Sequence, residues 1–210
     1  MDNMELTKQD MLKYFDEINN RLNERKVHGE IVMAGGAALT LVYDARNSTQ
    51  DIDAAFSPKE EFREIIKSIG NKYNLKDDWL NDGVKGFFTD KMKASVYKEY
   101  SNLTVLSMDA ESLLAMKLTS ARSDTKDAGD SITLMKHLKL KNIGEAFSII
   151  EKYAHRNRLT AQSKFFTIEV YAQYEKSNTL MGKMEAARQL VKEQELKSNT
   201  SQKSKYNEIE

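Results

Sequence analysis

The spacing of hydrophobic positions in the first half of the chain switches between helical and strand periods. Apolar residues recur every three to four positions from Met11 to Leu22, which predicts a helix over residues 8–25. Short apolar runs predict strands over residues 30–33, 52–56, 84–89 and 102–108. Further helices are expected over residues 37–44, 57–70 and 77–81. Residues 92–100 fit either a strand or a loop.

From residue 109 onward, the chain shows helical spacing or strong helix formers. The predicted helices cover residues 112–122, 127–138, 143–156, 161–175 and 180–197. Residues 198–210 are polar and aperiodic, so we expect disorder there. The expected fold class is α/β (α+β), with a small mixed sheet flanked by helices over residues 1–108, followed by a helical domain over residues 109–197. A ligand site would lie in the cleft between these two halves.

The helix expected after residue 56 has sequence signals at both ends. Ser57 is a suitable N-cap, Pro58 fits the first helical position, and Glu60 follows three residues after the cap. Gly70 supplies a C-terminal stop.

Composition excludes several classes of function. The chain has 210 residues, and Lys plus Arg equals Asp plus Glu at 32 each, so no overall basic field indicates nucleic-acid binding. Cysteine is absent, which excludes thiolate metal sites, and the three histidines lack metal-ligand spacing. The N-terminal residues do not resemble a signal peptide, and no apolar run approaches the roughly 20 residues that cross a membrane. We therefore expect a cytoplasmic protein without membrane contact.

Two glycines and two aspartates carry the most information about chemistry. Gly35 and Gly36 follow an apolar strand and precede a helix, which leaves backbone N–H groups open to a phosphate. Asp51 and Asp53 point to one face of a strand, with Cα atoms roughly 6–7 Å apart, which suits divalent ions such as Mg²⁺ or Mn²⁺. Together they are the minimum equipment for nucleotidyl transfer. The alternative is an ordinary turn and a solvated edge strand, but two unpaired acids one pleat apart repel each other.

This order of elements resembles the core motif of the nucleotidyltransferase superfamily of the polymerase-β type: strand, Gly35-Gly36, helix, and Asp51-x-Asp53 on the next strand. With Arg46 and Thr49 in the preceding turn, the motif looks closer to the AbiEii-type toxin branch and its uncharacterised bacterial relatives than to polymerases. The resemblance implies that Asp51 and Asp53 hold Mg²⁺ or Mn²⁺. Arg46 and Thr49 would either contact phosphate or simply build the turn.

In most of this superfamily, a third carboxylate on a nearby strand completes the metal site. The strand expected here, residues 103–108, contains no acid. Asp90 could replace it only if the fold brings it alongside Asp51 and Asp53.

A second stretch that resembles the AbiEii-type branch places Lys117 in a leucine-rich helix and two acids, Asp127 and Asp130, at the start of the next. Arg122 lies between Lys117 and Asp127 in the sequence. Lys117 borders an apolar stripe, so its side chain either snorkels to solvent or points into a cleft toward an anion, and the resemblance favours nucleotide binding. Asp127 either complements the helix dipole, acts as base for an acceptor hydroxyl, or anchors Lys117. Asp130 is expected to be structural.

Two functions fit these residues. The first is a metal-dependent nucleotidyltransferase with Asp51, Asp53, Lys117 and Asp127 as catalytic residues, which transfers a nucleoside monophosphate from an NTP to a tRNA, a protein or a small molecule. The resemblance to toxin–antitoxin modules adds a toxin role and a cognate antitoxin. The second is a non-catalytic nucleotide-binding or interaction module with a degenerate nucleotidyltransferase fold. An enzyme needs a third carboxylate or its equivalent near Asp51 and Asp53, whereas a binding module does not.

Overall fold

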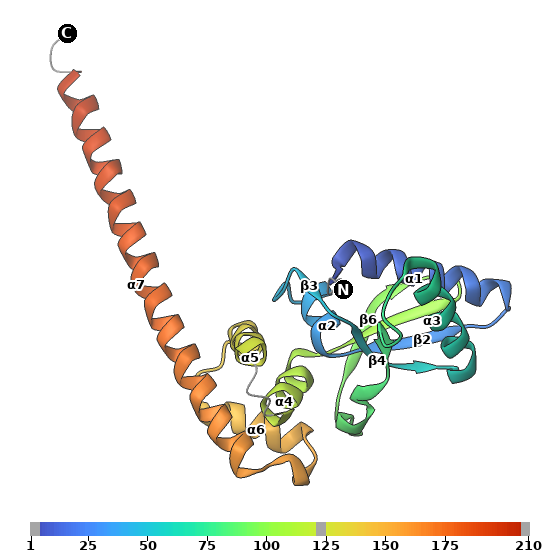
Figure 1. The fold of residues 1–210 in the computed structure, drawn as a ribbon. Helices are drawn as coiled ribbons and strands as arrows, with labels where there is room; N and C mark the ends of the chain where they lie inside the picture. Colours follow the sequence, from blue (N-terminus) through green and yellow to red (C-terminus); the bar gives the residue numbers. More distant parts are fainter. Residues whose placement is uncertain (1–4, 121–124, 207–210) are drawn as a thin grey trace. The chain divides into compact units, whose positions relative to one another are not determined.

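The computed structural model describes residues 5–120 and 125–206 (Figure 1). The chain divides into two compact units, residues 1–170 and residues 171–210. The first unit contains the whole sheet and all the residues of the candidate site. The boundary at residue 108 that the sequence suggests stays a prediction.

The centre of the first unit is a mixed sheet of five strands in the order β5-β4-β2-β7-β6. Strand β2 lies in the middle, antiparallel to β4 and parallel to β7. A separate antiparallel pair joins β1 (Leu6–Thr7) to β3 (Ser48–Thr49). The strands of the sheet are β2 (Gly29–Met33), β4 (Ile52–Ser57), β5 (Leu80–Asn81), β6 (Ala94–Glu99) and β7 (Leu103–Met108).

Strand register determines which loops meet at one edge of the sheet. Met33 at the end of β2 pairs with Ala54 near the start of β4. Asp53 in turn pairs with Asn81 of β5. The residues that follow β2 and those that begin β4 and β5 therefore lie together.

Helices α1 (Lys8–Glu24) and α3 (Lys59–Tyr73) pack on each other and on the sheet (Figure 1). Their apolar sides are buried, as the helical spacing predicts. The remaining elements of the α/β region are the short helix α2 (Gly35–Leu41) and the 3₁₀ helix η1 (Gly83–Phe87).

The helical region is built around α4 (Ala110–Ser120), which contacts both α5 (Thr125–Leu138) and α6 (Ile143–Tyr153). Most of α4 is buried, including Leu113, Met116 and Leu118. After η2 (Arg156–Arg158), the chain forms α7 (Ala161–Tyr206).

The structure confirms the expected fold class, a mixed sheet with flanking helices followed by helices in the C-terminal part. Residues 92–100, which fitted either a strand or a loop, contain strand β6. The helix expected to end at residue 122 is described to Ser120; residues 121–122 lie outside the described residues. In the described residues, no helix is long and apolar enough to cross a membrane.

Two local predictions between residues 77 and 89 are wrong. The expected helix over residues 77–81 is a turn followed by β5, and the expected strand over residues 84–89 is mostly η1. Trp79 explains the first difference: its side chain is fully buried and its Nε1 donates a hydrogen bond to the Ile66 carbonyl at 3.1 Å. Its own carbonyl accepts from Ile52 N at 2.7 Å, which directs the chain alongside β4.

The expected ends of α3 are also wrong. Its N-cap is Pro58 rather than Ser57, and the helix continues past Gly70 to Tyr73, where Asn74 takes the left-handed conformation with φ of 54°. Gly70 is buried inside the helix, next to the Trp79 indole. Gly70 therefore does not terminate the helix. A Cβ atom at this position would lie 3.5 Å from Trp79 Nε1, an ordinary van der Waals distance, so packing does not require a glycine there.

Helix α7 differs from the two helices and disordered segment expected over residues 161–210. It continues as one helix to Tyr206, although residues 198–206 are polar; residues 207–210 lie outside the described part. The segment contains no proline and Gly182 as its single glycine, so nothing in it blocks extension of a helix that has already formed.

Candidate active site

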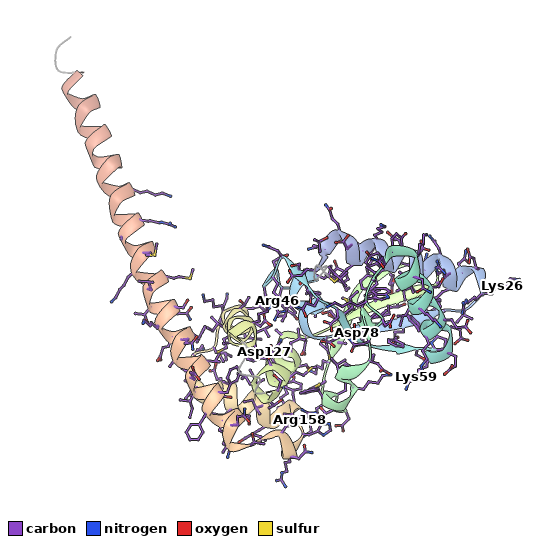
Figure 2. The ribbon with its side chains drawn as sticks, in the orientation of Figure 1. Lys26, Arg46, Lys59, Asp78, Asp127 and Arg158 are labelled. Carbon is purple, nitrogen blue, oxygen red and sulfur yellow. The ribbon has the colours of Figure 1, made fainter. Side chains whose placement is uncertain are left out.

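One cavity of about 660 Å³ in the first unit collects the residues that the sequence singles out. Its lining comes from α2, from the chain around β3 and β4, from β5 with η1, and from α4 with α5. In Figure 2, the labelled residues Arg46, Asp78 and Asp127 represent three of these segments. All eight predicted site residues line the cavity: Gly35, Gly36, Arg46, Thr49, Asp51, Asp53, Lys117 and Asp127. Their functional roles remain predictions.

The two glycines are packed directly against the polar side chains of the site. Gly35 has a φ of 54°, and a Cβ atom there would lie 2.7 Å from Asp53 Oδ2. A Cβ atom on Gly36 would overlap the hydroxyl of Thr49, which is buried. A larger residue at Gly35 would therefore displace Asp53, and a larger residue at Gly36 would displace Thr49. The two glycines are required for the packing of these polar side chains.

The acidic side of the cavity is formed by Asp51, Asp53 and Asp78. Asn81 Nδ2 donates a 3.3 Å hydrogen bond to Asp51 Oδ2. Burial raises the pKa of Asp51, and the negative charges of Asp53 and then Asp78 raise it further. This carboxyl is therefore held in a place that disfavours its ionised form.

The donor chemistry of this side fits a hard divalent cation. Carboxylate oxygens are the ligands that Mg²⁺ and Mn²⁺ prefer, and Mg²⁺ often uses only one or two carboxylates together with water and substrate phosphates. Within the described residues, no three His, Cys, Asp or Glu side chains form a ready ligand cluster. The pair Asp51 and Asp53 would thus hold an ion only with oxygens from a ligand or from water.

Two of the places considered for a third carboxylate do not supply it, whereas Asp127, the candidate from the helical region, does line the cavity. Strand β7 has no acid, and Asp90 is not among the described residues that line the cavity. Asp78, Asp82 and Asp127 do line it. Sequence reasoning missed Asp78 and Asn81, because it assigned both to a helix.

The opposite side of the cavity contains a network of charged residues. Lys117 Nζ lies 2.5 Å from Asp127 Oδ1 and 3.0 Å from Asp130 Oδ2, and its side chain is 14% exposed. Lys117 therefore does not snorkel to solvent. Ser120 Oγ donates to the other oxygen of Asp127 at 3.3 Å. The ion pair between Lys117 and Asp127 is the contact expected if Asp127 anchors Lys117, one of the roles that the sequence left open for Asp127.

Arg46 joins this network from the loop between α2 and β3. Its Nε donates to Asp130 Oδ1 at 2.7 Å, and its Nη2 pairs with the other carboxylate oxygen. Two-point contact of this kind fixes the orientation of a guanidinium group as well as its position. Arg122, which the sequence grouped with Lys117, lies outside the described residues.

Fold and site together have the features of a nucleotidyltransferase: the Gly35-Gly36 turn, an Asp-x-Asp strand packed against it, and cationic side chains in the same cavity. Residues 9–177 match the model of a family described as "Nucleotidyltransferase of unknown function (DUF6036)", and the chain belongs to that family. This confirms the resemblance to the nucleotidyltransferase superfamily, whereas the AbiEii-type branch stays a prediction. No curated protein and no solved structure matches the chain.

Proposed function

We propose that the chain transfers a nucleoside monophosphate from an NTP to a hydroxyl or phosphate acceptor, in the cavity between Asp53 and Lys117. The observation that carries this proposal is that three motifs line one cavity. Gly35 with Gly36, Asp51 with Asp53, and Lys117 with Asp127 all line the same space. Membership of a nucleotidyltransferase family supports the same reaction class.

The charge on the cavity wall supports a need for a divalent cation. Among the described residues, three cationic side chains line the cavity, Arg46, Lys117 and Lys126, against five carboxylates, Asp51, Asp53, Asp78, Asp82 and Asp127. A triphosphate would add negative charge to a wall that already has an excess of it. Asp51 and Asp53 would hold Mg²⁺ or Mn²⁺, which when bound offsets the charge of the triphosphate and of the departing pyrophosphate.

The residues of the chain would then divide the remaining tasks. The first N–H groups of α2, at Gly35 and Gly36, would contact phosphate oxygens, because the first N–H groups of a helix lack partners inside it. Arg46, whose Nη1 lies beside Gly36, and Lys117 of α4 would offer positive charge to the triphosphate. Asp127 would orient the acceptor hydroxyl and accept its proton while the acceptor oxygen bonds to the α-phosphorus and pyrophosphate leaves.

Labelled substrate tests the proposal directly. Purified protein is incubated with each α-³²P-labelled NTP, with Mg²⁺ or Mn²⁺, and with total RNA, cell lysate or small hydroxylated acceptors. Label should pass to one acceptor class with the wild-type chain and not with Asp53→Ala. If no NTP labels any acceptor with either metal, the second hypothesis, a non-catalytic nucleotide-binding or interaction module, replaces this one.

The acceptor class and the biological setting extend the proposal further. A toxin role in the cytoplasm, with a cognate antitoxin, is supported only by the resemblance of two stretches, Arg46 to Asp53 and Lys117 to Asp130, to the AbiEii-type branch. A tRNA, a protein or a small molecule would each fit as acceptor. Growth arrest on expression of the wild-type chain, absent with Asp53→Ala and relieved by co-expression of a neighbouring gene, is the result expected of a toxin.

A further inference from the structure

Asp130 differs from the other charged residues around the cavity because it lies behind the wall. Its side chain is 4% exposed, and it is not among the described residues that line the cavity. It nevertheless binds two cationic side chains that line the cavity. Arg46 Nε lies 2.7 Å from Asp130 Oδ1, and Lys117 Nζ lies 3.0 Å from Asp130 Oδ2.

The two cations reach Asp130 from separate parts of the chain. Arg46 lies in the loop between α2 and β3, Lys117 lies in the last turn of α4, and Asp130 belongs to α5. A free arginine or lysine side chain loses rotamer entropy when a ligand orders it, and this loss weakens binding. A carboxylate that already orders both groups removes part of that cost.

We propose that Asp130 is a positioning residue that holds Arg46 and Lys117 together as one wall for a polyphosphate. This inference rests on the proposed function for the identity of the ligand, an NTP. It assigns to Asp130, which the sequence suggested only as structural, a role in ligand binding exerted through its two partners.

Two physical roles for Asp130 predict effects of opposite sign. If its negative charge merely weakens the field of the two cations, removing it should strengthen binding of an anion. If it positions the cations, removing it should weaken that binding, although the local charge becomes more positive. The sign of the change therefore separates positioning from simple electrostatics.

The test measures binding of inorganic tripolyphosphate in the presence of Mg²⁺ by isothermal titration calorimetry. We expect Asp130→Asn to bind about 10-fold more weakly or worse than the wild type, the usual scale for residues that orient binding groups. Equal or tighter binding by a folded Asp130→Asn variant would overturn the proposal, and so would failure of the wild type to bind tripolyphosphate.

Glu17→Gln is a matched control. Glu17 also binds one arginine and one lysine, Arg21 at 2.9 Å and Lys72 at 3.0 Å, but on α1, and it does not line the cavity. Its substitution should leave tripolyphosphate affinity unchanged. A loss of affinity equal to that of Asp130→Asn would assign the effect to general destabilisation and overturn the proposal.

Asp130→Glu keeps the charge and gives a second route if Asp130→Asn does not fold. Moving the carboxylate by one methylene should still weaken tripolyphosphate binding, and wild-type affinity in this variant would contradict the positioning role. Because the ligand is tripolyphosphate, the result is independent of transfer. A wild-type chain that binds it but labels no acceptor would refute the transferase proposal alone.

Discussion

The two sides of the cavity differ in how their charges are balanced. On the side of α4 and α5, Arg46 and Lys117 are paired with Asp127 and Asp130 at hydrogen-bond distance. On the side of β4 and β5, Asp51 lies among further acids, and burial, then the charges of Asp53 and Asp78, raise its pKa despite the contact with Asn81. The charges on the α4 and α5 side are paired with each other, whereas the β4 and β5 side disfavours the negative charge of Asp51.

This difference indicates where a ligand would act. A balanced network gains little from a bound cation, but an acidic cluster that is costly in the free protein gains much from one. Sites that sacrifice stability in this way are typical of functional positions. The β4 side should therefore depend on a bound cation, whereas the α4 side should hold its ligand-binding groups in place without one.

Asp53→Ala should produce the largest effect on activity. Asp53 packs on Gly35 and lines the cavity, so removing its carboxylate leaves Asp51 as the sole acid of the pair. We expect transfer of label from an α-labelled NTP to fall by about 100-fold or more, which is beyond the loss typical of residues that only support a metal site.

The control for this prediction is Glu60→Ala, which removes an acid whose side chain is 80% exposed on α3. Its transfer rate should match that of the wild type. Normal transfer by Asp53→Ala with a normal melting temperature would remove Asp53 from the site.

Gly35→Ala should reduce both activity and stability. The new Cβ atom would lie 2.7 Å from Asp53 Oδ2 at a residue whose φ is 54°. The strained backbone and the displaced carboxylate together should cost about 1–3 kcal/mol in the free energy of unfolding, measured by urea denaturation. Gly182→Ala is the matched control: it lies in α7 with open space around it, so the alanine should be neutral or stabilising. Equal stability of both variants would show that Gly35 is not under steric constraint.

Much of the candidate site could be predicted from the sequence, because its glycine and aspartate motifs are local patterns. Gly35-Gly36, Asp51 and Asp53 lie within 19 positions of each other in the printed sequence, on adjacent elements whose strand and helix periods are clear. Their meeting in one cavity follows from the antiparallel pairing of β2 with β4. The class of fold and the core motif were therefore accessible without a structure.

The parts that sequence could not supply depend on tertiary contacts. Asp78 and Asn81 join the acidic side because buried Trp79 turns the chain and aligns β5 with β4, and this contact overrides the local helical appearance of residues 77–81. Asp130 meets Arg46 across 84 positions of sequence. No local pattern specifies a pairing over that separation, so its role emerged only from the geometry.

Lys117→Ala tests the balanced side, and it should lower stability as well as weaken triphosphate binding. The substitution leaves the buried Asp127 without its 2.5 Å partner, while Asp130 keeps Arg46. We expect a loss of about 1–3 kcal/mol in the free energy of unfolding, because a buried charge loses its compensation. Lys152→Ala is a suitable control, since it breaks an ion pair with Glu111 whose lysine side chain is 55% exposed, and exposed ion pairs of this kind contribute little to stability. A Lys117→Ala variant as stable as this control would show that the network does not stabilise the fold.

Asp51→Asn tests the unbalanced side through pH and should have the smallest effect. Because the pKa of Asp51 is raised in the folded protein, the folded state binds its proton more tightly than the unfolded state. Its contribution to stability is present below the ordinary aspartate pKa of 3.8 and is lost as the pH rises through the raised value. At neutral pH, the asparagine variant should therefore melt about 1–2 °C higher than the wild type, the scale of a change of about 0.5 kcal/mol.

The difference in melting temperature between Asp51→Asn and the wild type should depend on pH and on Mg²⁺. Lowering the pH from neutral toward the ordinary aspartate pKa should erase the advantage of Asp51→Asn, because the wild-type carboxyl becomes protonated and neutral as well. Millimolar Mg²⁺ at neutral pH should raise the melting temperature of the wild type more than that of the variant, since an ion that binds the folded state stabilises it by mass action. A pH-independent difference would place its origin in packing. Equal responses to Mg²⁺ would show that Asp51 does not hold the ion, and the contrast between the two sides would then lose its functional meaning.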